Sequence, residues 1–403
     1  MDENDFEHIL KISERRVREI STDIKRFLYD RIDWNDRLIA VLGSRGTGKT
    51  TLLLQHIKDE FKSNRDVALY ASLDNIWFKT HDVMDLVDYH YKHGGRYIFL
   101  DEVHHLEDWQ IIIKNIYDDY PRLNIVYTGS SLLKLDNDGA DLSRRQIVYK
   151  LPGLSFREYL YFEGKGKYSP VTFLDIKKNH VEIANEIVEK TEIIALFDKY
   201  LKTGYYPFYK EVHAGYEERL LQVIDLVLKV DYPAIETVSY ATIEKVKKML
   251  YILAQSCPQT PNMAELYREL MTDRNQGMKM LYSLDRANLL NLLSSEKATL
   301  KNMARPDKLY CDNTNLMYSL TEHIDIGTKR ETFFLNQVKS AGLVVQYPKN
   351  GDFLVDNQYL FEVGGRRKTF DQIKDIPNSY LAIDEEEVGR GNKIPLWLFG
   401  FLY

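Results

Sequence analysis

Gly43-Ser44-Arg45-Gly46-Thr47-Gly48-Lys49-Thr50 is the segment from which the architecture of this chain can be worked out. Gly43 and Gly48 lie five positions apart and are followed by a lysine and a hydroxyl residue, as in a phosphate-binding loop. The apolar run 38–42 precedes the segment, and a helical pattern from residue 49 follows it. Backbone N–H groups and the positive end of the helix dipole can therefore surround phosphate oxygens. The segment predicts a nucleotide site.

Strand and helix patterns alternate on both sides of this loop. Strands are expected at 38–42, 67–73, 96–101 and 123–129, and helices at 49–62, 82–92 and 107–119. This alternation is typical of a parallel α/β sheet. Within it, Lys49 is expected to reach the β and γ phosphates, and the Thr50 hydroxyl is expected to coordinate Mg²⁺.

Two acids end the third strand of the expected sheet. Asp101 and Glu102 follow the apolar run Tyr97-Ile98-Phe99-Leu100. Because the carboxyl ends of parallel strands form the ligand edge of such a sheet, Asp101 is placed to hold Mg²⁺ directly or through water. Glu102, one residue later, is placed to orient and polarise an attacking water. Together with the phosphate loop, the pair favours a nucleotide-hydrolysing site over a simple turn.

The neighbouring strand and the loop after it contribute one further catalytic candidate each. Ser130, after the run 124–128, is the favoured sensor of the γ-phosphate, whereas Thr128 is assigned a structural role for its β propensity. Residues 134–145 are polar and predict a surface loop. Arg145 near its end is either a group that neutralises charge on the transferred phosphoryl group or an ordinary surface arginine.

The rest of the chain divides into four further regions. Residues 1–36 predict N-terminal amphipathic helices whose arginines, Arg26 among them, are read as a solvated face. The ATPase-type core is expected at 37–162 and a helical lid at 163–236, interrupted at the Thr203–Pro207 segment. Three helices and a strand pair are expected at 237–327, a combination that is typical of a winged helix. Residues 328–403 are expected to form a small α+β domain.

The last two regions suggest partners without settling them. The third helix of the expected winged helix carries three basic residues that could contact DNA phosphates, Arg274, Lys279 and Arg286. The mixed charge around them favours packing between domains instead. A DNA or a protein partner therefore stays open. In 328–403, Asp352 and Glu362 face one side of a hairpin if its turn has an odd number of residues. With Glu331 they would resemble a divalent-metal nuclease site.

Composition limits the function classes. The chain has 403 residues, enough for two or three domains, and a formal charge of -6, so no overall basic field favours nucleic acid. The two cysteines, Cys257 and Cys311, suit a reduced cytoplasm and small core positions rather than a metal site. No stretch approaches a membrane span, and the acidic N-terminus lacks an apolar signal core. A cytoplasmic protein with no membrane contact is expected.

The motifs together resemble a family of bacterial and archaeal AAA-type ATPases with a C-terminal domain of unknown function related in fold to restriction endonucleases. The resemblance covers nearly the whole chain and rests on 43–51, 99–104 with Trp109, 127–131, 154–159, 361–365 and 394–400. It implies ATP and Mg²⁺ as cofactors, Asp101 and Thr50 on the metal, Glu102 as the water-activating base, and an arginine near Arg145. The expected nucleotide-binding residues are Gly43, Ser44, Arg45, Gly46, Thr47, Gly48, Lys49, Thr50 and Thr51.

The endonuclease half departs from the family pattern. Endonucleases of this fold carry a lysine two residues after the second acid, where this chain has Gly364. Lys368 and Arg366 are close, but they lie beyond a Gly-Gly turn and cannot be assumed to swing back, so a domain used for binding or regulation is favoured over a working nuclease. The favoured function is a Mg²⁺-dependent ATPase that acts as a conformational switch for its C-terminal domains. The alternatives are a nucleotide-gated DNA- or protein-binding module, a helicase-like or nuclease-linked ATPase, and a small-molecule kinase.

Overall fold

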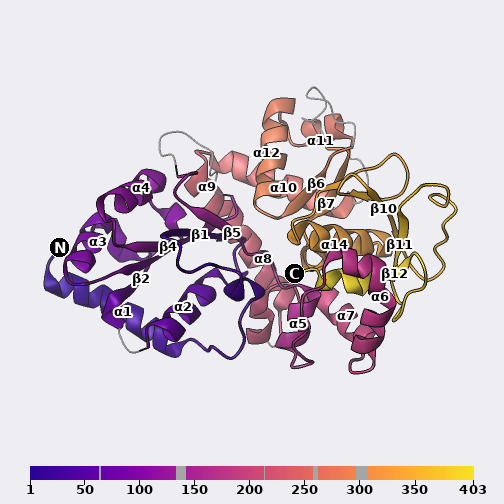
Figure 1. The fold of residues 1–403 in the computed structure, drawn as a ribbon. Coiled ribbons are helices and arrows are strands. Elements are labelled where there is room, and N and C mark those ends of the chain that lie inside the picture. The colour runs from indigo at the N-terminus through magenta and orange to yellow at the C-terminus, as the bar shows by residue number, and fades with distance from the viewer. Residues whose placement is uncertain (63–64, 133–141, 213, 257–261, 296–305) are drawn as a thin grey trace. The chain divides into compact units, whose positions relative to one another are not determined.

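The computed structural model describes residues 1–62, 65–132, 142–212, 214–256, 262–295 and 306–403 (Figure 1). These residues form two compact units. The first contains residues 1–152 and 230–237, and the second contains residues 153–229 and 238–403. This division does not test the five regions expected from the sequence, which stay a prediction.

The first unit is built on a five-stranded parallel sheet in the order β2-β3-β4-β1-β5. The strands are β1 (Leu38–Gly43), β2 (Ala68–Ser72), β3 (Tyr97–Asp101), β4 (Asn124–Ser130) and β5 (Ile147–Lys150). The four strands expected from the sequence are present. The fifth, β5, was not predicted, because it is a short edge strand with few buried side chains. The order places the acid strand β3 beside β4, as expected.

Helices cover both faces of this sheet (Figure 1). They are α1 (Glu3–Glu19), α2 (Lys49–Glu60), α3 (Val83–Lys92) and α4 (Trp109–Asp119). Alternate residues of β1 separate the two cores: Leu38 and Leu42 pack with α3 and α4, whereas Ile39 and Val41 pack with α2. Burial on both faces is why β1 reads as a continuous apolar run rather than an alternating one.

The second unit contains most of the remaining helices. They are α5 (Phe156–Phe162), α6 (Phe173–Val188), α7 (Ile193–Thr203), α8 (Tyr216–Leu226), α10 (Tyr240–Ser256), α11 (Met263–Glu269), α12 (Arg274–Arg286), α13 (Thr314–Leu320) and α14 (Ile326–Ser340). The antiparallel pair β6 (Leu290–Leu293) and β7 (Lys308–Cys311) follows α12. Three helices and a strand pair are therefore present where a winged helix was expected, and the domain type itself stays a prediction.

The C-terminal part of the second unit is a mixed five-stranded sheet in the order β12-β11-β10-β9-β8. The strands are β8 (Val345–Gln346), β9 (Phe353–Val355), β10 (Tyr359–Gly364), β11 (Ser379–Ile383) and β12 (Lys393–Pro395). Phe361 pairs with Phe353 across the β9–β10 hairpin, so Asp352 stands opposite Glu362. The turn of three residues, 356–358, meets the odd-number condition.

Two smaller expectations also concern the described residues. Cys311 is buried, which agrees with a core role, whereas Cys257 lies outside the described residues. In the part of the chain that the structure describes, no helix combines the length and the apolar character needed to cross a bilayer.

Candidate nucleotide-binding site

The phosphate loop runs from the end of β1 into the first turn of α2. Gly46 and Gly48 have φ values of 83° and 93°, a region that only glycine enters without strain. The side chain of Lys49 is 4 % exposed and curls back over the loop, where Nζ donates to the carbonyls of Gly43 at 3.0 Å and Ser44 at 3.2 Å. The loop thus has the closed geometry that the motif predicts.

A buried arginine from the N-terminal region braces this loop. The guanidinium of Arg26 donates to the carbonyl oxygen of Thr47 and, at 2.8 Å, to that of Pro152. Arg26 is 4 % exposed, so its reading as part of a solvated face was wrong. The helix ends at Glu19, and Arg26 lies in the following non-helical segment, where helical spacing no longer says which way a side chain points.

Asp101, at the end of β3, is enclosed by hydroxyl groups. Its carboxylate accepts hydrogen bonds from Thr50 Oγ1 at 2.7 Å, from the Tyr70 hydroxyl at 2.8 Å, and from Thr128 Oγ1. Burial, followed by the nearby charge of Glu102, raises the pKa of this carboxyl, although the three hydroxyls oppose the shift. The two residues predicted to hold Mg²⁺, Thr50 and Asp101, are therefore in direct contact.

Glu102 connects the phosphate loop with the segment after β3. Its φ of 58° is unusual for a residue with a side chain, and such backbone strain is concentrated at functional sites. Oε1 lies 3.7 Å from Lys49 Nζ, and Oε2 lies 3.4 Å from His104 Nε2. The backbone N–H of Glu102 donates to Thr128 Oγ1 at 2.9 Å. Thr128 therefore contacts both acids, a role that its assignment as a simple β-former missed.

A late segment of the chain completes the first unit at this site. Asp231, just before α9 (Tyr232–Ile235), accepts two hydrogen bonds from the Arg45 guanidinium at 2.7 and 3.2 Å. Its Oδ1 also lies 3.6 Å from His104 Nε2, an electrostatic contact rather than a hydrogen bond. Burial alone would raise the pKa of Asp231, but interactions with His104 and Arg45 outweigh it and lower the pKa to about 2. No local sequence pattern could have placed Asp231 beside the phosphate loop.

The other two predicted catalytic residues, Ser130 and Arg145, lie in different surroundings. Ser130 is buried at the end of β4, pairs in register with Gly43, and accepts the backbone N–H of Leu132. Arg145 lies against α4, where it forms an ion pair with Asp118. Most of the loop expected at 134–145 lies outside the described residues. The roles proposed for Ser130 and Arg145 stay predictions.

The acids of the C-terminal sheet have one unexpected neighbour. Lys368 folds back over Gly364 and places its Nζ 2.6 Å from Glu362 Oε1, a position that the sequence alone did not predict. Without a Cβ, Gly364 leaves room for this side chain. Burial, followed by the charge of Glu331, raises the pKa of Asp352 to about 6. Glu331 itself is held by Lys308 at 3.0 Å and by the Tyr310 hydroxyl at 2.6 Å.

Comparison with known proteins supports the first unit's assignment. Residues 35–160 match the family model described as an AAA domain. This segment is an AAA-type P-loop domain. Along most of its length the chain is also similar to the uncharacterized protein MJ1637 of Methanocaldococcus jannaschii, with 26 % identity over 399 residues that cover 91 % of this chain and 84 % of that protein.

Solved structures give only a distant likeness. DnaA of Aquifex aeolicus bound to AMPPCP is 17 % identical to this chain. The match covers 69 % of this chain and 88 % of the DnaA chain, with a TM-score of 0.28. PCH-2 of C. elegans is 15 % identical to this chain. The match covers 68 % of this chain and 67 % of the PCH-2 chain, with a TM-score of 0.24. TM-scores this low do not support an assignment of function. The function is therefore inferred from the AAA domain and the geometry of the site.

Proposed function

We propose that the first unit binds ATP with Mg²⁺ and hydrolyses its β–γ phosphoanhydride bond. The observation that supports this most is the convergence of two motifs, the phosphate loop after β1 and the acid pair after β3, at one edge of the sheet. Thr50 contacts Asp101 at 2.7 Å, and Lys49 lies 3.7 Å from Glu102. A lysine, a hydroxyl and two acids in this arrangement are the parts that phosphoryl transfer requires, because its catalysis consists of positioning and charge stabilisation.

The donor set fits Mg²⁺. Asp101 and the Thr50 hydroxyl offer only oxygen atoms, which this small, hard cation prefers. Burial makes the negative charge of Asp101 unfavourable, as its raised pKa reflects, and a bound cation would offset that cost. Mg²⁺ would supply charge neutralisation for the β and γ phosphates.

The chain's own residues then have separate roles. The loop N–H groups and Lys49 bind the phosphates, and the dipole of α2 adds positive potential at the same place. Glu102, the only one of the two acids whose side chain is not fully buried, orients the attacking water and accepts its proton. Thr128 holds both acids in place through its single hydroxyl. Ser130 contacts the γ-phosphate from β4.

The switch is proposed to act through Asp231. The segment 230–237 belongs to the first unit, yet it is joined at both ends, residues 229 and 238, to the second. Arg45 in the phosphate loop and His104 after the acid motif both contact Asp231. A movement of Arg45 on phosphate binding therefore changes the charge balance at a segment covalently continuous with the rest of the chain.

ATP turnover tests the proposal. Purified full-length protein should hydrolyse ATP in the presence of Mg²⁺, and Lys49→Ala should abolish both binding and turnover. Lys62→Ala, which alters an exposed lysine paired with Asp59, serves as the matched control and should match the native rate. The proposal is wrong if the native protein binds no ATP, or if Lys49→Ala and Lys62→Ala have equal effects.

A second candidate function is metal-dependent phosphodiester cleavage in the second unit. It is favoured by one observation, the ammonium group that Lys368 places beside Glu362. Asp352, opposite Glu362 on the hairpin, adds a second carboxylate on the same face of the sheet. A lysine at this distance can stabilise charge that develops on a phosphate in the transition state.

The second candidate needs a cleavage assay rather than an ATPase assay. Linear duplex DNA and single-stranded DNA would each be incubated with the protein and either Mg²⁺ or Mn²⁺. Cleavage that Glu362→Gln and Lys368→Ala both abolish, and that Lys374→Ala at an exposed site retains, would support it. Intact DNA under all these conditions would exclude cleavage and leave the unit a binding or regulatory domain.

A further inference from the structure

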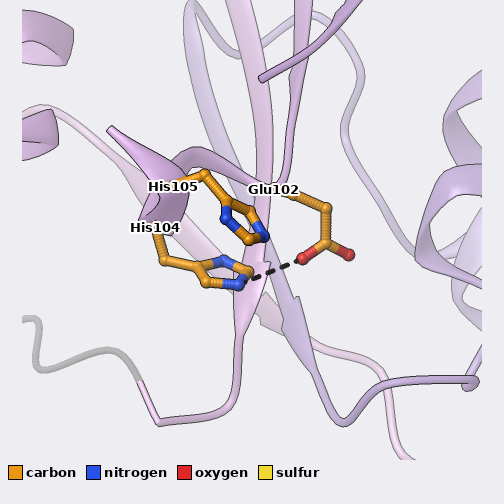
Figure 2. A group of neighbouring side chains, drawn as sticks. All are labelled: Glu102, His104 and His105. Carbon is orange, nitrogen blue, oxygen red and sulfur yellow. Dashed lines mark ion pairs between the residues drawn. The ribbon is translucent and has the colours of Figure 1, made fainter. Parts of the chain in front are cut away.

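Three potential metal ligands converge directly after the acid strand. Glu102, His104 and His105 each offer one donor atom, and these atoms lie within 4.8 Å of one another (Figure 2). The left-handed backbone at Glu102 and the following 3₁₀ turn, Val103–His105, bring the three side chains together. The cluster is separate from the Thr50–Asp101 contact that is proposed to hold Mg²⁺.

His104 is the side chain that points to a ligand. It is 2 % exposed, and neither of its ring nitrogens has a hydrogen-bond partner among the described residues. Its Nε2 forms electrostatic contacts with Glu102 Oε2 at 3.4 Å (Figure 2) and with Asp231 Oδ1 at 3.6 Å, but neither contact has hydrogen-bond geometry. Buried polar groups normally form hydrogen bonds, so a buried imidazole that forms none, with two carboxylates close by, indicates a place for a ligand.

The spacing suits a small tetrahedral cation. When a metal binds nitrogen and oxygen at about 2.0–2.1 Å, neighbouring donors of a tetrahedron lie about 3.3–3.4 Å apart. The separation of 3.4 Å between His104 and Glu102 matches that edge. His105 offers a third donor atom within 4.8 Å of the other two.

The ligand types select the metal class. Two imidazoles and a carboxylate suit Zn²⁺ and related transition-metal ions, whereas Mg²⁺ and Ca²⁺ prefer oxygen donors alone. Zn²⁺ is therefore the class of cation that these three side chains favour.

We propose that Glu102, His104 and His105 form a Zn²⁺-class site that, when occupied, arrests the ATPase. A metal on Glu102 Oε2 prevents this carboxylate from orienting water or accepting its proton. The arrest rests on the hydrolysis proposed above, but metal binding itself does not. Asp231 sits beside the site and is held by Arg45, so the same ion would also stabilise the segment 230–237 in one position.

Metal binding is tested first without nucleotide. Tag-free full-length protein is titrated with Co²⁺, whose visible absorption reports four-coordinate geometry, and Zn²⁺ is then added to displace it. One equivalent should bind, excess Mg²⁺ should not compete, and His105→Gln should weaken binding about 10- to 100-fold. His93→Gln, at an exposed histidine on the C-terminal end of α3, should bind as the native protein does. Equal binding by the native protein and His105→Gln would overturn the site.

Inhibition is tested with Mg²⁺ and ATP present. Saturating Zn²⁺ should slow native hydrolysis by about 100-fold, the usual contribution of a general base, and a chelator should restore it. For His105→Gln, inhibition is measured relative to the metal-free rate of the same variant. Half-maximal inhibition of this variant should need a correspondingly higher concentration of Zn²⁺. A protein that hydrolyses ATP but neither binds Co²⁺ nor responds to Zn²⁺ refutes the metal site and leaves the proposed function intact. A protein that binds Co²⁺ but never hydrolyses ATP refutes the function and the arrest, and retains the binding site.

Discussion

Replacing Asp231 with asparagine removes the charge that holds the phosphate-loop arginine. Asp231 is 2 % exposed, and its pKa of about 2 lies about two units below the ordinary value of 3.8. At 1.36 kcal/mol per unit, this corresponds to about 2–3 kcal/mol of stabilisation of the charged form. Asp231→Asn also leaves Arg45 without its bidentate partner, although the side chain of Arg45 is 29 % exposed and keeps some water. The expected loss in the free energy of unfolding is therefore about 2–3 kcal/mol.

Urea denaturation followed by tryptophan fluorescence measures this loss. Trp34, Trp77 and Trp109 lie in the first unit and only Trp397 in the second, so the signal reports mainly the first unit. The matched control is Asp88→Asn, because Asp88 also lies in the first unit and pairs with Lys92 but is 38 % exposed. That pair should contribute less than about 1 kcal/mol. An Asp231→Asn variant as stable as Asp88→Asn would refute the view that the Arg45–Asp231 pair secures the segment 230–237.

Three other substitutions give independent tests. Arg26→Ala removes the brace on the Thr47 carbonyl and should weaken ATP binding about tenfold in a fluorescent-nucleotide titration, whereas exposed Arg15→Ala should not. Thr128→Val keeps the β-branched shape but loses the hydroxyl shared by both acids, so kcat should fall about tenfold with little change in KM. Burial raises the pKa of Asp312 to about 7, so the ionisation of this carboxyl alone should lower the stability of the second unit by at most about 4 kcal/mol as the pH rises from about 4 to about 7. Asp312→Asn lacks this contribution, so its stability relative to the native protein in thermal unfolding should increase over the same pH range.

Much of the first unit was predictable because its signals are local. A buried parallel strand is apolar throughout, a phosphate loop needs its glycines, and both features are contiguous in sequence. The Thr50–Asp101 contact followed from a general rule, since carboxyl ends of parallel strands meet at one edge of the sheet. The same reasoning placed Asp352 opposite Glu362, because strand register depends only on the number of turn residues.

The residues that sequence reasoning missed depend on distant or irregular parts of the chain. Arg45 and Asp231 are 186 positions apart, and nothing near either residue marks the other. Arg26 lies in a non-helical segment, and Lys368 crosses a Gly-Gly turn whose path no periodicity describes. Thr128 shows a further limit: β propensity explains why threonine suits the strand, but it does not exclude a second role for the hydroxyl.

The most direct test of the account compares Glu102→Gln with Glu107→Gln under saturating ATP and Mg²⁺. Glutamine keeps the shape of Glu102 but cannot accept a proton, and Glu107 is an exposed glutamate five residues later. We expect Glu102→Gln to bind ATP as tightly as the native protein and to hydrolyse it at least about 100-fold more slowly, while Glu107→Gln retains the native rate. Native turnover by Glu102→Gln would contradict the assignment of this residue as the base and, with it, the proposed hydrolytic site.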